Sequence, residues 1–146
     1  MFLNEFQREQ RKQIINKLEE MPIGAIFREI HPEEIPQYRE IIKRPMDLEK
    51  VKRHLTNKKE YTSRKFEEEM KLIFDNCRLF NQGCSIYVWA ADELEKIYEK
   101  KMGKIAPTPR ERWLKDISNV GSKLKSATKQ LSNLILDSKS DNHSSK

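Results

Sequence analysis

The chain has 146 residues and a mass of 17.4 kDa, which is the size of one domain with a short appendage. Charged and hydrophobic residues each make up 36%, so a lean core lies under a heavily charged surface. No apolar run is long enough to cross a membrane, and no charged start leads into an apolar stretch, so we expect neither a membrane span nor a signal peptide. Two cysteines cannot form a disulfide framework and suit a reducing compartment.

The net charge of +6 is unevenly distributed. Residues 1–100 carry 19 basic and 19 acidic side chains, whereas residues 101–146 carry 10 basic and 4 acidic ones. The sequence therefore describes a neutral body with a basic appendage. We expect a body over residues 1–103, a basic helical extension over residues 104–137 and a disordered tail over residues 138–146.

Helical periodicity dominates the body. We expect a first helix between Asn4, which can cap it, and Pro22, which ends it. Asp47 is a candidate cap for a short second helix, Ser63 opens a strong third helix, and Ser85 caps a fourth. With no strand signal, four amphipathic helices predict an all-α four-helix bundle.

The segment Pro22–Pro45 cannot be one helix because it contains four prolines. It is unusually apolar for a connection, with isoleucines, Phe27 and Tyr38. Long connections are usually functional or disordered, and disorder does not suit this composition. We therefore expect a long ordered loop that folds back on the helices and is the first place to look for a site.

Little in the sequence indicates catalysis. None of the three histidines has a metal-ligand neighbour at a suitable spacing, and no glycine-rich phosphate loop is present. Cys77 falls on an apolar helix face, which favours an unreactive core thiol. The run Glu67–Glu69 is typical of a solvated helix face. We expect no enzyme activity, no cofactor and no metal.

Asn81 stands at the end of the predicted third helix, before a tight loop. One interpretation makes it a C-cap residue in the left-handed conformation. A second places its amide at the mouth of an apolar slot, where it can donate to a carbonyl and accept from an N–H. Such a slot suits a neutral secondary amide on an aliphatic stem.

Two segments of the sequence resemble the bromodomain family. The first matches the family pattern P-x-Y…I-I-x-x-P-M-D-L and consists of Pro36-Gln37-Tyr38 and Ile41-Ile42-Lys43-Arg44-Pro45-Met46-Asp47-Leu48. The second resembles the family pattern F…I-F-x-N-C…Y/F-N…S and consists of Phe66, Ile73-Phe74-Asp75-Asn76-Cys77, Phe80-Asn81 and Ser85. The two occur in the family's order, and with the helical frame the match extends over about residues 4–102. The resemblance implies a left-handed four-helix bundle with a long ordered first loop, to which this chain adds a C-terminal helix.

The resemblance also implies a function, which is binding of N-ε-acetyl-lysine, chiefly on histone tails. Asn81 matches the residue whose amide donates to the acetyl carbonyl, and Tyr38 matches the tyrosine that reaches the same oxygen through water. Tyr87 sits where the family places a residue that gates the entrance. Further residues are expected to line or adjoin the pocket, namely Phe27, Ile30, Ile35 and Phe80. Phe80 replaces a more frequent tyrosine, which removes a hydroxyl that could tether the first loop.

As a member of this family the protein would be an epigenetic reader in the nucleus, with acetylated histones or other acetylated proteins as partners and a role in transcription regulation.

The extension beyond the bundle begins with Thr108-Pro109, a strong helix start. Its apolar residues then alternate spacings of four and three over three heptads, from Trp113 to Leu134. Three interpretations are open. They are a coiled-coil seam for self-association or a partner, packing on the bundle, and weak non-specific DNA contact through lysines. The alternative to a reader is thus a helical scaffold or DNA-binding adaptor that works through this basic helix.

Overall fold

A computed structural model describes residues 1–141, with side chains through residue 137. The chain divides into two compact units, Met1–Ile105 and Ala106–Lys146. Within the described residues the regular elements are helical, and they are α1 (Glu5–Glu19), a 3₁₀ helix η1 (Pro22–Phe27), α2 (Tyr38–Ile41), α3 (Leu48–Asn57), α4 (Ser63–Phe80), α5 (Ser85–Met102) and α6 (Pro109–Asp141).

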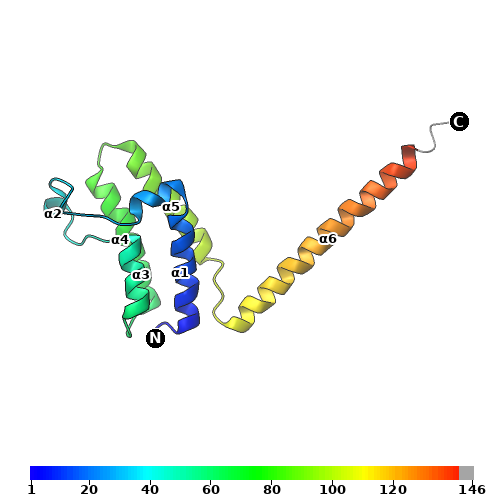
Figure 1. Cartoon of the computed structure of the whole chain (residues 1–146), viewed down its shortest axis with the longest axis horizontal. Helices are drawn as coiled ribbons and strands as arrows, with labels where there is room; N and C mark the ends of the chain where they lie inside the picture. The colour runs from blue at the N-terminus through cyan, green and yellow to red at the C-terminus, as the bar shows by residue number, and fades with distance from the viewer. Residues whose placement is uncertain (142–146) are drawn as a thin grey trace. The chain divides into compact units, whose positions relative to one another are not determined.

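The first unit is a bundle of the four helices α1, α3, α4 and α5 (Figure 1). Helix α1 packs against α3 and α5, and α4 packs against the same two helices, so α1 and α4 stand diagonally opposite. The 3₁₀ helix η1 covers α1 and α5. This arrangement confirms the expected all-α four-helix bundle.

The helix starts follow local capping chemistry. Asn4 forms a reciprocal capping box with Gln7, and the Asp47 carboxylate accepts from the Lys50 N–H at 2.6 Å. Both caps confirm the sequence-based expectation. Helix α4 begins at Ser63, as expected, with Thr62 as its cap. Only the start of α5 differs, since the cap is Cys84, which makes no capping side-chain bond, and Ser85 is the first helical residue.

The bundle core is made of aliphatic and aromatic side chains from all four helices. Its largest fully buried members are Tyr61, Phe27, Phe66, Phe74, Ile15, Leu18, Ile42, Leu48, Leu55, Met70, Ile73 and Leu94. The expectation that Glu67–Glu69 is a solvated face is wrong for Glu69, which is 1% exposed. Its carboxylate accepts from the Tyr61 hydroxyl and lies 2.8 Å from His54 Nδ1, and these contacts replace the water that burial removes.

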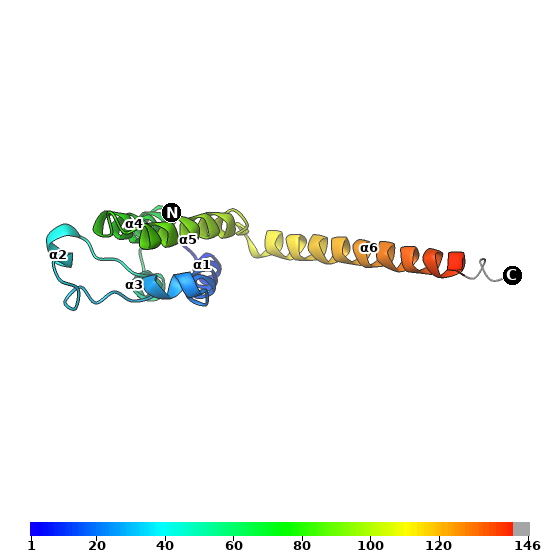
Figure 2. The ribbon, with the colours of Figure 1, turned by 90° about the horizontal axis from the view of Figure 1, so that it is seen from above.

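The connection between η1 and α3 is ordered, as expected, but it folds back on the helices only in part. Helix α2 packs against α4, whereas the chain around it extends away from the four helices (Figures 1 and 2). Its ends are fastened to the bundle. The Asp47 carboxylate accepts from the Ile30 N–H at 3.3 Å, and the Glu49 N–H donates to the Arg28 carbonyl at 3.0 Å. A buried amide, Asn76 Nδ2, donates to the Arg44 carbonyl at 2.9 Å.

The second unit consists of α6. Thr108 Oγ1 accepts from the Glu111 N–H at 3.2 Å, and Pro109 is the first helical residue. The helix continues to Asp141 and so includes the beginning of the segment 138–146 that we expected to be disordered. The rest of that segment, residues 142–146, lies outside the described part of the chain.

Among the described helices, none combines the length and the apolar character that a membrane span requires.

Candidate functional site

The C-terminal end of α4 positions Asn81. Its Nδ2 donates to the Cys77 carbonyl at 2.9 Å, and its own carbonyl accepts from the Cys84 N–H at 2.9 Å. These two bonds hold the residue from both sides. Nδ2 also donates to Cys77 Sγ at 3.6 Å, and because sulfur is a weak acceptor this second hydrogen can turn to a ligand's carbonyl, while Oδ1 is an acceptor. The arrangement can therefore offer a fixed amide to a ligand.

Asn81 is the C-cap of α4, as one interpretation predicted, but it does not have the left-handed conformation which that interpretation gave it. Asn81 caps α4, but its φ of −97° lies outside the left-handed region. The positive φ of this turn falls at Gly83, at 84°, where glycine adopts it without steric cost. The backbone conformation at position 81 is open to most residues and does not call for asparagine. A role for this asparagine must therefore come from its side-chain amide.

Tyr38 begins α2 and is buried although it belongs to the long connection. Its ring lies 4.9 Å from that of Phe80, centroid to centroid, which joins α2 to the end of α4. Burial, followed by the nearby Cys77 and Asp47, raises the pKa of the Tyr38 hydroxyl. The hydroxyl therefore stays protonated at neutral pH and can donate.

Cys77 links the two sides of this region. Its Sγ lies 3.6 Å from Asn81 Nδ2 and donates to the Tyr87 carbonyl at 3.5 Å, which ties the end of α4 to the first turn of α5. Burial raises the pKa of the thiol. A protonated, packed thiol agrees with the structural role expected for it.

The remaining predicted site residues occupy three kinds of environment. Tyr87 is 44% exposed on the first turn of α5, as a residue at an entrance would be. Ile30 and Ile35 are partly buried in the long connection, with Ile30 held by Asp47 and the Ile35 carbonyl accepting from the Tyr38 N–H at 3.2 Å. Phe27 is 2% exposed and packs edge-on against Phe74, at 6.0 Å between centroids, inside the core.

Two residues that position the long connection each have one role that the sequence analysis missed. Asp47 was expected only to cap α3, yet its second carboxylate oxygen also holds Ile30. Asn76 was noted only as part of a motif, yet it fastens the connection at Arg44. A polar residue on a helix face that is otherwise apolar, as Asn76 is beside Ile73, was the signal that could have found it.

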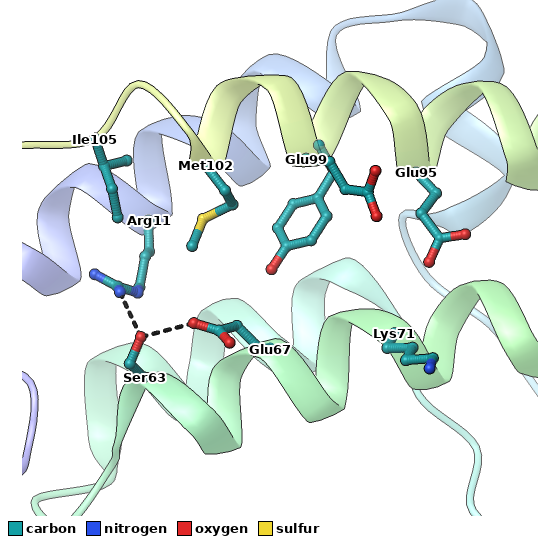
Figure 3. A pocket seen from close by; sticks show the side chains of 9 residues that line it. Arg11, Ser63, Glu67, Lys71, Glu95, Glu99, Met102 and Ile105 are labelled. Carbon is teal, nitrogen blue, oxygen red and sulfur yellow. Dashed lines mark hydrogen bonds between the residues drawn. The ribbon is translucent and has the colours of Figure 1, made fainter.

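A separate cavity of about 580 Å³ lies between α1, α4 and α5 (Figure 3). None of the predicted site residues lines it; its lining consists of Arg11, Ser63, Glu67, Lys71, Glu95, Tyr98, Glu99, Met102 and Ile105. Arg11 donates to Ser63 Oγ at 2.7 Å, and that hydroxyl donates to Glu67 at 2.9 Å. The Arg11 guanidinium also lies 5.5 Å from the centroid of the Phe66 ring. This region is a polar cluster that joins three helices.

Among the residues that the structure describes, no three His, Cys, Asp or Glu side chains are grouped so that they could hold a metal ion.

Together, the bundle, the long first connection and the fixed amide after α4 describe a small helical binding module. The family model for the bromodomain matches residues 11–93, which is more than half of the chain. The chain belongs to the bromodomain family.

Curated relatives carry the same segment. The chain is 34% identical over 76 residues to the histone acetyltransferase GCN5 of Yarrowia lipolytica, and 37% identical over 76 residues to bromodomain-containing factor 1 of Candida albicans. It is 44% identical over 70 residues to a bromodomain-containing protein of Dictyostelium discoideum. These alignments cover 52%, 51% and 46% of this chain but only 16%, 10% and 4% of the relatives. The similarity therefore concerns one module of much longer proteins.

Proposed function

We propose that the protein is a non-catalytic reader that binds N-ε-acetyl-lysine beside Asn81. In this proposal Asn81 Nδ2 exchanges its weak bond to Cys77 Sγ for a hydrogen bond to the acetyl carbonyl, and the Tyr38 hydroxyl reaches the same oxygen through a water molecule. Tyr87 gates the entrance, and Phe27, Ile30, Ile35 and Phe80 form or support the apolar wall. The observation that carries the proposal is the Asn81 amide, which is held by Cys77 and Cys84 and has one of its two N–H donors on a weak sulfur acceptor.

The charge state of the ligand decides recognition. Acetylation turns a lysine ammonium into a neutral amide with an apolar methyl group. The carboxylate that acts electrostatically on Tyr38 belongs to Asp47, and its two oxygens already accept the backbone N–H groups of Lys50 and Ile30. A charged ammonium would thus lose its hydration without gaining a dedicated partner, and this cost excludes unmodified lysine.

We place the protein at chromatin in the nucleus, with acetylated histone tails as the first ligands to test. Membership of the bromodomain family supports this choice, as does the histone acetyltransferase named among the relatives. The acetyltransferase activity in that name belongs to a protein of which the aligned segment is 16%. One or two hydrogen bonds and a small apolar burial predict a Kd of about 1 μM to 1 mM for a single mark.

The test compares an acetylated lysine peptide with its unmodified form by calorimetry. Wild-type protein should bind only the acetylated peptide, and Asn81→Ala should lose this binding while keeping the helical circular dichroism spectrum. Gln82→Ala, which removes the neighbouring exposed amide, should bind like the wild type. Equal binding of both peptides by the wild type, or full binding by Asn81→Ala, would contradict the proposal.

A DNA-binding adaptor is the second candidate, and the exposed lysines of α6 are the observation that favours it. Lys115, Lys123, Lys125 and Lys129 all reach solvent. Such contact would be non-specific and would weaken steeply with salt. A labelled duplex titrated at two salt concentrations separates this function from peptide reading, since Asn81→Ala would not change it.

A further inference from the structure

Helix α6 carries an apolar stripe that nothing in its own unit covers. We call it the α6 seam, and it consists of Trp113, Ile117, Val120, Leu124, Ala127, Leu131 and Leu134. The six large side chains of the α6 seam are between 48% and 66% exposed. Leu114 and Ile135 flank it and are each 49% exposed. A set of this size on one helix face marks an interaction surface.

The helix needs a partner for its own stability. Gly121 lowers helix propensity in its middle, and three hydroxyl groups donate back to carbonyls of the preceding turn. A single helix in water gains little stability from propensity, and most of its stability comes from packing of an apolar face. The α6 seam is the face that such packing would use.

The hydrophobic period and the length of the α6 seam indicate which helix can cover it. The α6 seam alternates spacings of four and three without interruption, a pattern that packs best against a helix of the same period over the same length. It runs from Trp113 to Leu134, or about 32 Å at 1.5 Å per residue. The longest helices of the bundle, α4 and α5, have 18 residues each and span only about 27 Å. Among the described elements, only another α6 has both the period and the length.

We propose that the α6 seam binds the α6 seam of a second copy, so that the protein is a coiled-coil homodimer. Burying a large aliphatic side chain removes on the order of 100 Å² of apolar surface from water. The six large seam residues and their two flanking neighbours therefore bury roughly 800 Å² per copy, which is the share of each partner in a standard-size specific interface.

The net charge of α6 gives an α6–α6 contact a salt dependence opposite to that of binding to nucleic acid. Over residues 109–137 the helix carries six basic and three acidic side chains, all outside the α6 seam. Two copies brought together therefore repel one another, and added salt screens that repulsion. The dimer should tighten as NaCl is raised from 50 to 500 mM, whereas binding of the same lysines to nucleic acid should weaken.

Dimerisation would place two bundles in one particle. If each bundle reads an acetylated lysine, two marks on one histone tail or nucleosome could be held at once, which raises the overall affinity without any new contact in the pocket. The dimer itself rests only on α6 and does not depend on the proposed ligand.

Sedimentation equilibrium of the full chain tests the proposal. Wild-type protein at tens of micromolar should have twice the 17.4 kDa mass of the chain. Leu124→Glu with Leu131→Glu places charges in the α6 seam and should give a monomer, with a dimer Kd raised at least tenfold. The matched control is Ser126→Glu with Ser132→Glu, which adds the same charge outside the α6 seam and should remain a dimer.

Several results would overturn the proposal. They are a wild-type mass of one chain or of more than two, a dimer that persists in the seam variant, and a dimer that dissociates when salt is added. Thermal melting of the bundle provides a check on folding, because a seam variant that is monomeric with an unchanged bundle melt has lost only the contact between copies.

Discussion

Two buried tyrosines of the bundle differ in what their hydroxyl groups contact. The Tyr61 hydroxyl donates to the buried Glu69 carboxylate. The Tyr98 hydroxyl is also buried, but it has no hydrogen-bond partner within the described part of the chain. Replacing each tyrosine by phenylalanine keeps the ring and removes only the hydroxyl. The same substitution should therefore change stability in opposite directions at the two positions.

The magnitudes follow from the cost of burying polar groups. A desolvated group without a partner costs about 1–3 kcal/mol, so Tyr98→Phe should raise the free energy of unfolding by about 1 kcal/mol. A hydrogen bond to a charged group contributes about 1.5–3 kcal/mol, so Tyr61→Phe should lower it by about 2 kcal/mol. For a domain of this size 1 kcal/mol corresponds to a Tm change of about 4–8 °C.

Urea unfolding followed by circular dichroism at one protein concentration measures both variants against the wild type. The midpoint of Tyr98→Phe should rise and that of Tyr61→Phe should fall, with unchanged slopes. The reasoning would be refuted if Tyr98→Phe destabilised the protein as much as Tyr61→Phe, because the Tyr98 hydroxyl would then have a stabilising partner.

Three other predictions concern the same bundle and α6. Gly24→Ala should lower the free energy of unfolding, measured with urea, by more than about 3 kcal/mol, because a Cβ there would lie 1.7 Å from the Leu18 carbonyl oxygen. Gly121 has open space around it, so Gly121→Ala should instead increase the helicity of α6 measured by circular dichroism. Asn76→Ala should cost about 2 kcal/mol in urea unfolding and weaken acetyl-peptide binding, because it leaves the Arg44 carbonyl without its donor. Alkaline pH should destabilise the protein. Burial raises the pKa of Tyr98 in the folded state, so above the unfolded tyrosine pKa of about 10 this hydroxyl ionises in the unfolded chain and stays protonated in the folded one. Stability is therefore unaffected by this group below that pH and falls as the pH rises above it. Tyr98→Phe should make the loss of urea stability between about pH 9 and 11 shallower, and an unchanged slope would contradict this assignment.

The features that the sequence predicts well are those decided within a few residues. The caps at Asn4 and Asp47 and the start at Pro109 depend on side chains one turn away, so spacing alone identifies them. The bundle follows from amphipathic stripes of helical period. Family motifs then place Asn81 and Tyr38 at the ends of elements that the structure brings together through Phe80 and Cys77.

The features that the sequence does not reveal depend on contacts between distant segments. Glu69 lies in a run of three glutamates. Its carboxylate can be buried only because His54 of α3 and Tyr61 of the following turn form polar contacts with it that replace its hydration. The second role of Asp47 depends in the same way on where the long connection places Ile30. In each case the deciding partner lies well outside one helical turn, where periodicity carries no information.

The central claim is that the pocket beside Asn81 reads acetyl-lysine, and an NMR titration tests it most directly. Isotope-labelled protein should show shifts at Asn81, Tyr38 and Tyr87 on addition of an acetylated lysine peptide, and none on addition of the same peptide unmodified. Identical shifts with both peptides, or shifts confined to residues outside this region, would contradict the account.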